Sequence, residues 1–453
     1  MDYQVIVIGA GPGGYPAALK AARMGARVCI VESGPVGGTC LNRGCIPTKA
    51  LVESASVFRR ARRAGEYGVE VGEPVLNYAR VRSRQDELVT RLRSGVQLLL
   101  KNSRIELVQA RGRLAGGTMV ELESSGGRVE RITGERVIVA TGSEPLLPKS
   151  LGYDGEVVLS STEMLQLDEL PETLLIAGGG VIGCEFAGIF ATMGVRVILA
   201  EAQPTILPFI DEDLARRLQV FLKQQGIDLR TKTRILEVAR DGRRARVALS
   251  DGAEVTVDKV LIAIGRSLNT VDLGLEQAGV ATDSGSVIVN DSMETSAPGV
   301  YAVGDITGKA LLAHVATAQG VAAAANALGG KQPVDYDAIP NCIFTYPEIG
   351  SVGITSREAK NRGIPLKTGK SLFAANGKAL CEGEADGFVK VLAAAETGRL
   401  LGLHIIGPHA TELLAEGALA VRWGLTVSQF SDTIHAHPTL SESVRDAVEA
   451  AEN

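Results

Sequence analysis

Two cysteines five residues apart, Cys40 and Cys45, are the side chains of this sequence best suited to redox chemistry. They lie in residues 39–47, directly after a Gly37-Gly38 turn. A chain of 453 residues can bury a sizeable core without a covalent staple, and a disulfide across so short a loop removes little unfolded-state entropy. The pair therefore favours a dithiol that opens and closes. On spacing alone, two ordinary buried cysteines remain the alternative.

A second candidate for chemistry is the segment His-Ala-His-Pro-Thr-Leu-Ser-Glu at residues 435–442. A proline fixes the turn after His437, and Glu442 is close enough in sequence for its carboxylate to fold back and orient the imidazole. Such a pair is typical of a general base, which could ionise an incoming thiol. The His-x-His spacing lacks a third ligand, so we expect no metal. A satisfied surface pair, His435 and His437, is the other alternative.

The N-terminal residues predict a dinucleotide site. An apolar strand at residues 3–8 precedes Gly-Ala-Gly-Pro-Gly-Gly at 9–14, a helix at 15–24, and a strand at 27–31 that ends at Glu32. Glycines in such a turn let the backbone reach a pyrophosphate at a helix N-terminus, where free amides and the helix dipole favour anions. Glu32 is placed to accept hydrogen bonds from ribose hydroxyls.

The same pattern returns without gaps at residues 178–183, followed by a strand at 196–200 that ends at Glu201. Each acid follows the first glycine of its turn by 23 positions, and Met24-Gly25 matches Met193-Gly194 in this register. Two dinucleotides side by side suggest a relay of electrons. A carboxylate at Glu201 would repel a ribose 2′-phosphate, so the second site favours NAD over NADP.

The remaining pattern predicts an α/β protein with two Rossmann-like dinucleotide-binding domains and an α+β C-terminal domain. Arginine-rich helices are expected at 50–63 and 81–102, and a β-meander through Gly117, Glu123 and Gly127. Strands at 137–142 and 260–265 bracket the repeat, so the second unit is expected as an insertion. The first dinucleotide-binding domain is predicted to comprise residues 1–143 and 266–335. The inserted second one is predicted at 144–265, and the C-terminal domain at 336–453.

Composition excludes several classes of function. The net charge of −5 gives no reason to expect a nucleic acid or membrane partner. Glycine is in excess, 53 residues or about 12% against a usual ~7%. The sequence shows no basic leader, so we expect a cytoplasmic protein, or one in an organelle matrix if a transit peptide has been removed. The single cysteines are expected in the core or at the surface: Cys29, Cys184, Cys342 and Cys381.

Together, residues 37–49 and 435–442 resemble the redox-active and base segments of the pyridine nucleotide–disulfide oxidoreductases, in particular their lipoamide branch. The resemblance implies a homodimer with FAD at the first dinucleotide site and NAD at the second. Cys45 would face the flavin and Cys40 would exchange with substrate, while His437 and Glu442 would come from the other subunit. The implied reaction oxidises dihydrolipoamide, free or on a lipoyl domain, and an acyltransferase core of a 2-oxo acid dehydrogenase complex, or a glycine-cleavage system, is a possible partner.

The resemblance also implies an ion pair between Lys49 and Glu185 beside the flavin. The cofactor contacts that it implies are Gly9, Gly11, Gly14, Glu32, Lys49, Thr141, Gly142, Asp305, Ala313, Gly178, Gly180, Gly183, Glu201, Gly265 and Arg266. From its position after an apolar strand, Asp305 could instead cap a following helix. Two positions depart from the family pattern, Pro16 in the first helix and Lys309 in the turn after Asp305.

Two other functions remain open on the sequence. A glutathione reductase-like reductase of low-molecular-weight disulfides would share the fold and the cysteines, although Glu201 and the Thr-Leu-Ser that follows Pro438 argue against it. A flavoprotein diaphorase, or a scaffold that binds an acyltransferase core, would leave the cysteine pair and its base without a purpose.

Overall fold

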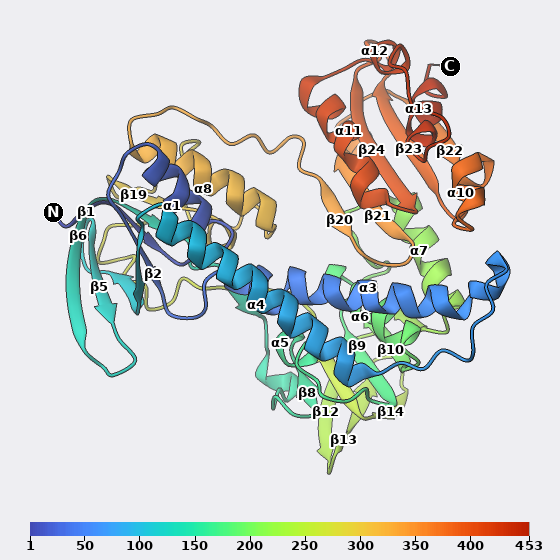
Figure 1. The fold of residues 1–453 in the computed structure, drawn as a ribbon, viewed down its shortest axis with the longest axis horizontal. Coiled ribbons are helices and arrows are strands. Elements are labelled where there is room, and N and C mark those ends of the chain that lie inside the picture. Colours follow the sequence, from blue (N-terminus) through green and yellow to red (C-terminus); the bar gives the residue numbers. More distant parts are fainter. Residues whose placement is uncertain (453) are drawn as a thin grey trace. The chain divides into compact units, whose positions relative to one another are not determined.

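The computed structural model describes residues 1–452, and these form two compact units (Figure 1). The first unit comprises Met1–Leu51, Asn77–Leu146 and Arg266–Asp335, and the second comprises Val52–Leu76, Leu147–Gly265 and residues 336–452. The predicted α/β fold class is confirmed. Each unit contains a parallel sheet of the Rossmann-like kind, and the C-terminal part of the second unit is an antiparallel sheet with helices. The division into three domains stays a prediction. No helix within residues 1–452 combines the length and apolar character that crossing a membrane requires.

The sheet of the first unit has the strand order β3-β2-β1-β6-β5-β4, with β19 also paired to β6. Its strands β1, β2, β3 and β19 run parallel to their neighbours, while β4 and β5 form the antiparallel meander. The elements of this unit are β1 (Tyr3–Ile8), α1 (Gly14–Arg23), β2 (Val28–Glu32), α2 (Gly38–Arg43), the first residues of α3 (Cys45–Arg62), α4 (Tyr78–Asn102), β3 (Glu106–Gln109), β4 (Arg111–Leu114), β5 (Met119–Glu123), β6 (Val129–Val139), β7 (Ser143–Pro145), β16 (Arg266–Leu268), β17 (Thr282–Asp283), β18 (Ser286–Val287), β19 (Val300–Ala302), the 3-10 turn Asp305–Thr307 and α8 (Ala313–Ala327).

The second unit contains a parallel sheet of order β11-β10-β9-β15-β8 and an antiparallel sheet of order β12-β13-β14. Its elements up to this point are the rest of α3, the 3-10 turns Ala64–Tyr67 and Lys149–Leu151, β8 (Val158–Leu159), α5 (Ser161–Met164), β9 (Thr173–Ala177), α6 (Val181–Thr192), β10 (Arg196–Glu201), α7 (Glu212–Gln224), β11 (Asp228–Thr231), β12 (Ile235–Asp241), β13 (Arg244–Leu249), β14 (Glu254–Val257) and β15 (Lys259–Ile262).

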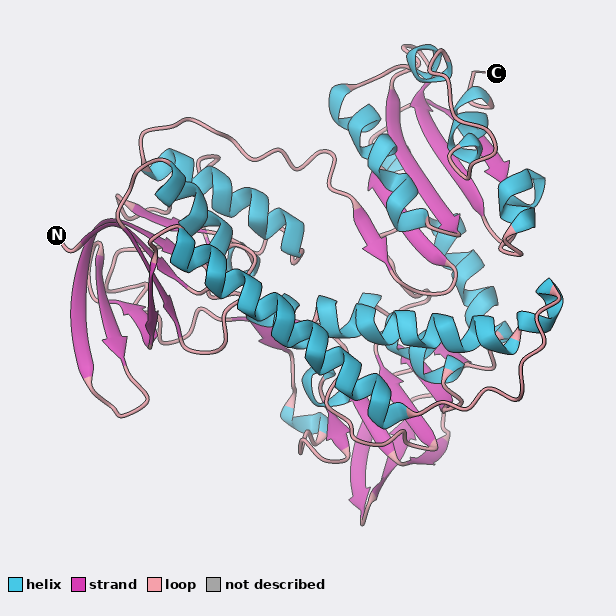
Figure 2. Ribbon diagram, viewed as in Figure 1, coloured by secondary structure: helices cyan, strands magenta, loops and turns pink. Residues whose placement is uncertain are grey.

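The C-terminal part of the second unit is an antiparallel sheet of order β20-β21-β24-β23-β22. Helices α11 and α13 pack on one face of it through a shared apolar core, and Figure 2 shows α11 lying along these strands. The elements are β20 (Asn341–Ile343), β21 (Glu348–Gly353), α9 (Ser356–Asn361), β22 (Leu366–Leu372), the 3-10 turn Phe373–Ala375, α10 (Gly377–Cys381), β23 (Phe388–Ala394), β24 (Leu400–Gly407), α11 (Ala410–Trp423), α12 (Val427–Ser431) and α13 (Glu442–Glu449).

The internal repeat is a repeat of packing as well as of sequence. Gly9 donates its N–H to Val31 at 2.7 Å, and Gly178 donates to Ala200 at 2.8 Å. A side chain on Gly14 would collide with the carbonyl of Gly9, and one on Gly183 would collide with the carbonyl of Gly178. In both copies, therefore, the helix after the turn rests directly on the turn's backbone, an approach that only glycine permits.

Some predicted elements differ in extent from those observed. The strand predicted at residues 137–142 is the end of one longer strand, β6, whose first half pairs with β5 in the meander and whose second half pairs with β1. The helix predicted at 50–63 begins at Cys45, and the one predicted at 81–102 begins at Tyr78. Both helices begin before the predicted residues, α3 with a proline in its first turn and α4 directly after Asn77, whose side chain accepts a hydrogen bond from the N–H of Arg80.

The glycine contact in the second copy is testable by substitution on α6. We expect Gly183→Ala to lower stability by about 1–3 kcal/mol, because the new methyl group overpacks the turn. Gly188→Ala on the same helix is the control, since the nearest atom to an added methyl there lies 3.9 Å away. This control should be neutral, or stabilising by up to about 1 kcal/mol. The measurement is the thermal unfolding midpoint of each purified variant, and equal losses in both would contradict the packing.

Candidate active site

The cysteine pair lies where helix α2 ends and helix α3 begins. Cys40 is in α2 and Cys45 is the first residue of α3, with both thiols partly buried. Gly44 separates the helices with φ −146° and ψ −114°, outside helical geometry. A side chain on Gly44 would stand 3.3 Å from the Cα of Cys40, so glycine permits the chain to double back. The structure thereby brings the two cysteines together, and their side chains share a hydrogen bond.

The segment that holds the cysteines rests on the first dinucleotide turn. Gly37 donates its N–H to the carbonyl of Ala10 at 2.8 Å. Gly38 has φ +59°, and a side chain there would come within 2.6 Å of the Cα of Gly11. This contact between two glycines places the redox segment directly against the turn predicted to bind a pyrophosphate.

An asparagine between the cysteines, Asn42, secures this segment and was not predicted as a site residue. Its amide donates to the carbonyls of Val36 at 3.0 Å and Gly38 at 2.9 Å, and its oxygen accepts from Nε of Arg93 at 2.9 Å. Arg93 lies on α4, one of the two helices that the sequence predicts to be rich in arginine. The side chains of α4 therefore have a structural part in the site that sequence spacing does not show.

The protonation of Cys40 is governed by its surroundings. The hydrogen bond with Cys45 and then burial raise the pKa of Cys40 above its ordinary value, while the charge of Lys49 acts in the opposite direction. In the dithiol state, Cys40 is therefore a protonated thiol at neutral pH. A thiol must be ionised before it attacks a disulfide, so thiol exchange at this pair calls for a base.

The two repeat acids make equivalent hydrogen bonds. Glu32 accepts from the N–H groups of Ala10 and Gly34, both at 2.7 Å. Glu201 accepts from the N–H groups of Gly179 and Gln203, both at 2.6 Å. An ionised carboxylate has about four acceptor positions, so each acid retains capacity to bind ribose hydroxyls as predicted.

The glycine turns fit dinucleotides. Helices α1, α6 and α8 each begin without a hydrogen bond from a side chain at the N-cap, which leaves backbone N–H groups for an anion. An added side chain would meet nothing within 4 Å at Gly180, so this glycine faces open space beside the helix start. The predicted contact Ala313 is the first residue of α8, and α8 packs on α1 (Figure 1).

The unusual Pro16 is accommodated in the first turn of α1. It is the third residue of that helix, where a backbone N–H has no partner within the helix. Tyr15 and Ala17 on either side keep their bonds to the carbonyls of Gly11 and Gly13. The other departure, Lys309, is exposed in the turn after Gly308.

Asp305 opens a 3-10 turn, and its carboxylate accepts a hydrogen bond from the hydroxyl of Ser143 at 2.5 Å. Arg266 donates to the Ser143 hydroxyl at 2.7 Å and to its carbonyl at 2.6 Å, and lies 3.9 Å from Asp305. Strands β7 and β16, which carry Ser143 and Arg266, pair with each other. The structure therefore joins two predicted residues, Asp305 and Arg266, through a serine that the sequence analysis did not select.

Thr141 and Gly142 follow β6 in a turn held by Asn269. The hydroxyl of Thr141 donates to the carbonyl of Asn269 at 2.8 Å, and the amide of Asn269 donates back at 2.9 Å. The equivalent residue of the second repeat, Gly265, follows β15. Their contacts with cofactors stay predictions.

Glu185 is buried on α6, with a 4% exposed side chain, and accepts from the N–H of Phe344 at 2.9 Å. Lys49 lies in the first turn of α3, where its charge reaches Cys40. The ion pair between Lys49 and Glu185 stays a prediction.

The histidine segment contains two imidazole–carboxylate pairs. His437 Nδ1 lies 3.0 Å from Glu442 Oε1, and the His437 side chain is 80% exposed. Hydrogen bonds lower the pKa of Glu442, the one from the N–H of Thr439 having the larger effect and the one with His437 the smaller. This carboxylate is therefore ionised at neutral pH. The ring nitrogen Nε2 of His437 is left facing outward, as a base requires.

His435, by contrast, is a structural residue. Its side chain is 6% exposed, its Nδ1 lies 2.9 Å from the carbonyl of Thr433, and its Nε2 lies 3.2 Å from Glu416. The ring also packs against Phe430 at 5.4 Å between centroids. The alternative of a surface histidine pair is therefore wrong for His435, and Glu416 is a partner that spacing did not suggest.

Comparison with known proteins agrees with this geometry along the whole chain. Residues 3–320 match the family model described as pyridine nucleotide-disulphide oxidoreductase, and residues 339–448 match the dimerisation domain of the same family. The latter supports a homodimer.

The curated relatives include dihydrolipoyl dehydrogenases of Bacillus subtilis, 40% identical over 100% of this chain and 98% of the relative, and of Chlamydia trachomatis, 42% identical over 97% and 95%. Among solved structures, LpdA of Mycobacterium tuberculosis is 30% identical with a TM-score of 0.93, covering 98% of this chain and 99% of that one. The HOCl-induced flavoprotein disulfide reductase RclA of Escherichia coli is 29% identical with a TM-score of 0.89, covering 99% of both chains. The chain belongs to the pyridine nucleotide-disulphide oxidoreductase family.

Proposed function

We propose that this protein is a dihydrolipoyl dehydrogenase, which oxidises dihydrolipoamide to lipoamide with NAD as the electron acceptor. The observation that carries the proposal is that one chain contains both a cysteine pair and a histidine–carboxylate pair. A cysteine pair rests on the first glycine turn through Gly38 and Gly11, and a His437–Glu442 pair leaves an imidazole nitrogen exposed. Full-length relatives that are about 40% identical bear the same activity in their names.

The proposed reaction begins with proton transfer. His437 takes a proton from one thiol of dihydrolipoamide, and the ionised Glu442 stabilises the imidazolium that results. The substrate thiolate attacks Cys40 of the Cys40–Cys45 disulfide, and Cys45 leaves as a thiolate. The second substrate thiol then attacks the mixed disulfide, which releases lipoamide and returns Cys40 as a thiol. Two electrons have passed from the substrate to the cysteine pair.

Enzymes of this family use FAD and NAD, and a bound flavin would supply two-electron chemistry between the cysteine pair and the nicotinamide. The glycine turns at Gly9 and Gly178 would hold their pyrophosphates, and Glu32 and Glu201 their riboses. Lys49 and Glu185 would form the ion pair beside the flavin, with Asp305, Arg266 and the remaining predicted contacts around it.

We further propose that His437 and Glu442 act on the cysteine pair of the partner subunit. The support is that both residues lie within 339–448, the part of the chain that matches the dimerisation domain. A lipoyl domain, the acyltransferase core of a 2-oxo acid dehydrogenase complex or a glycine-cleavage system would supply the substrate. The cytoplasmic location stays a prediction.

The first prediction concerns substrate and coenzyme. Dihydrolipoamide should reduce NAD in a spectrophotometric assay, with NADP less effective by roughly 100-fold, because a 2′-phosphate would meet the Glu201 carboxylate. Glutathione should give no coenzyme reduction. A preference for NADP, or turnover with glutathione alone, would favour a reductase of low-molecular-weight disulfides.

The second prediction concerns the cysteine pair. Cys40→Ser and Cys45→Ser should each lower dihydrolipoamide oxidation by at least about 10³-fold, because neither variant can form the disulfide. Both should keep NADH-dependent reduction of ferricyanide, which does not need the pair. Cys381→Ser, at an exposed cysteine, is the matched control and should behave as the wild type. Retained dihydrolipoamide oxidation in Cys45→Ser would place catalysis elsewhere.

The third prediction uses the ionisation of Glu442. Glu442→Gln should lower dihydrolipoamide oxidation by about 10²-fold, because the imidazolium loses its carboxylate. The pKa of Glu442 lies below its usual 4.5, and a lowered carboxyl pKa gives an interaction that is lost only as the pH falls through that value. The two rates should be compared at about pH 8, far above that value, where the Glu442 carboxylate is ionised. A rate for Glu442→Gln within about twofold of wild type would contradict the role of this carboxylate, and Glu449→Gln on the same helix serves as control.

A further inference from the structure

A row of polar side chains crosses the C-terminal sheet. Lys390 on β23 lies opposite His404 on β24, which lies opposite Ser351 on β21. The residues beside them in these strands, such as Val389 and Leu403, belong to the apolar core shared with α11 and α13. Because side chains alternate across a strand, the polar row faces the other side of the sheet, where α7 packs against β24.

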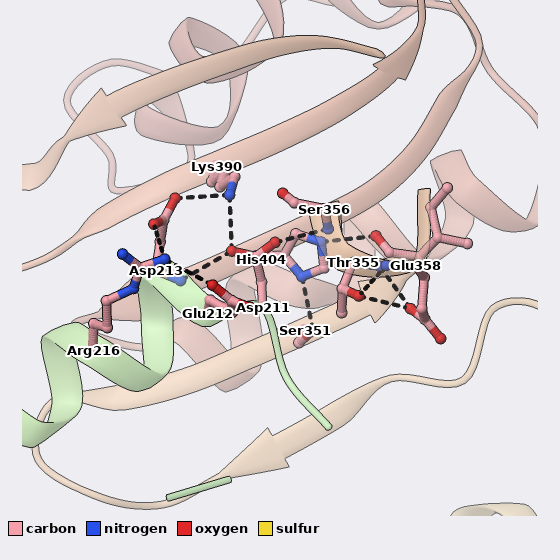
Figure 3. Close-up of polar contacts among 11 residues, drawn as sticks. Asp211, Glu212, Asp213, Arg216, Ser351, Thr355, Ser356, Glu358, Lys390 and His404 are labelled. Atoms are coloured by element: carbon pink, nitrogen blue, oxygen red, sulfur yellow. Dashed lines mark hydrogen bonds and ion pairs between the residues drawn. The ribbon is translucent and has the colours of Figure 1, made fainter. Parts of the chain in front are cut away.

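Lys390 there meets two carboxylates at the start of α7 (Figure 3). Its Nζ donates to Asp211 at 2.8 Å and to Asp213 at 2.7 Å, and the Asp211 and Lys390 side chains are 1% and 9% exposed. The second oxygen of Asp211 accepts from the N–H of Ser356 at 3.0 Å. Burial acts to raise the pKa of Asp211, but these partners, Lys390 first, hold it below its ordinary value. The contact is therefore a fully buried, charged and hydrogen-bonded pair.

His404 does not supply the positive charge. Its Nε2 lies 3.0 Å from the carbonyl of Ile354, which can only accept, so this nitrogen carries the proton. Its Nδ1 then accepts from the hydroxyl of Ser351 at 2.8 Å. Complete burial lowers the pKa of His404, in keeping with a neutral ring. Lys390 is thus the cation that faces Asp211 from this row.

Asp211 directly follows a loop of residues 202–210, and this loop begins directly after Glu201. At its start, Gln203 donates its N–H to the Glu201 carboxylate at 2.6 Å. In its middle, Leu207 donates its N–H to the carbonyl of Gly179 at 3.0 Å. The loop is therefore bonded both to the second glycine turn, at Gly179, and to Glu201, the acid proposed to bind the ribose of NAD.

The loop is also packed tightly between these bonds and Asp211. Ile206, Leu207 and Ile210 are buried, and a methyl group added to Gly179 would come within 2.7 Å of Ile206. Ile210 donates its N–H to the carbonyl of Leu207 at 3.2 Å, which closes the last turn before Asp211. These contacts form a continuous connection from Asp211 through Leu207 to the glycine turn.

We propose that Asp211 and Lys390 are positioning residues for NAD: their ion pair fixes the far end of the 202–210 loop, and so holds Gly179 and Glu201 in the geometry that binds the coenzyme. This inference rests on the proposed function for the identity of the coenzyme. A loop without strand or helix hydrogen bonds has many conformations, and anchoring its end reduces the entropy lost on binding. A buried ion pair has one good geometry, whereas an apolar contact tolerates sliding.

The test measures the NADH site separately from the dithiol site. NADH oxidation is coupled to ferricyanide, so that each NADH gives two electrons to two ferricyanide ions and releases a proton. In Lys390→Met, a side chain of similar length without charge, the dissociation constant of NAD, measured by calorimetric titration, should rise about tenfold. The KM for NADH should rise by the same factor, with kcat within about twofold of wild type. The KM for dihydrolipoamide should not change. A purely structural role would instead lower kcat with both substrates.

Two further variants complete the design. Lys370→Met is the matched control, because Lys370 lies opposite Lys390 in register on β22 but is exposed over the Phe388 ring, 3.7 Å from its centroid. Asp211→Asn keeps a side chain that caps α7 and loses the charge. Asp211→Asn should raise the KM for NADH, and the double variant with Lys390→Met should match the larger single effect rather than the product of the two, because both residues act through one contact.

An unchanged KM for NADH in Lys390→Met and in Asp211→Asn would overturn the proposal. So would equal losses of kcat with NADH and with dihydrolipoamide. If Lys390→Met does not fold because a lone buried charge remains, the double variant, which has none, decides between these outcomes. Failure of the proposed function is distinguishable, since a wild-type protein inactive with dihydrolipoamide but active with NADH and ferricyanide still allows every comparison.

Discussion

The close approach of one backbone to another at glycine is the constraint on which this structure depends. Gly14 rests on the carbonyl of Gly9, and Gly38 rests on the Cα of Gly11, so that helix, turn and redox segment form one stack. A single methyl group at either contact would separate these layers. The cysteine pair owes its position beside the first dinucleotide turn to this absence of side chains more than to any strong attraction.

The second copy of the same contact serves a different purpose. Gly183 rests on Gly178 as Gly14 does on Gly9, but no redox segment follows Glu201. In its place is a loop that the C-terminal sheet holds through Asp211. The same pattern of strand, turn, helix and acid is thus followed by a cysteine pair in one copy and by an anchored loop in the other.

The electrostatics of the cysteine pair keep it from acting as its own base. Hydrogen bonding to Cys45 and burial keep Cys40 protonated in the dithiol state, and Lys49 opposes this only in part. The proposed reaction therefore needs a separate base for the substrate thiol. The group that we propose is His437, an exposed imidazole paired with the ionised carboxylate of Glu442, in the part of the chain that matches the dimerisation domain.

Local sequence determined the elements whose chemistry is local. Strand β1 coincides with the predicted residues 3–8, the repeat register holds down to the hydrogen bonds of Glu32 and Glu201, and His437 meets Glu442 five positions away. In each case a run of backbone hydrogen bonds, a glycine turn or a short side-chain reach fixes the geometry. Such interactions leave a period or a spacing in the sequence.

Only the tertiary structure decided the long-range partners. Asn42 and Arg93 are 51 positions apart, Ser143 and Asp305 are 162 apart, and Asp211 and Lys390 are 179 apart. Lys390 in a strand and Arg93 in an arginine-rich helix both resemble solvated charges, since nothing in the neighbouring residues indicates what covers them. Whether a charge is buried depends on which element packs over it, and that packing is set by the whole fold rather than by any local pattern.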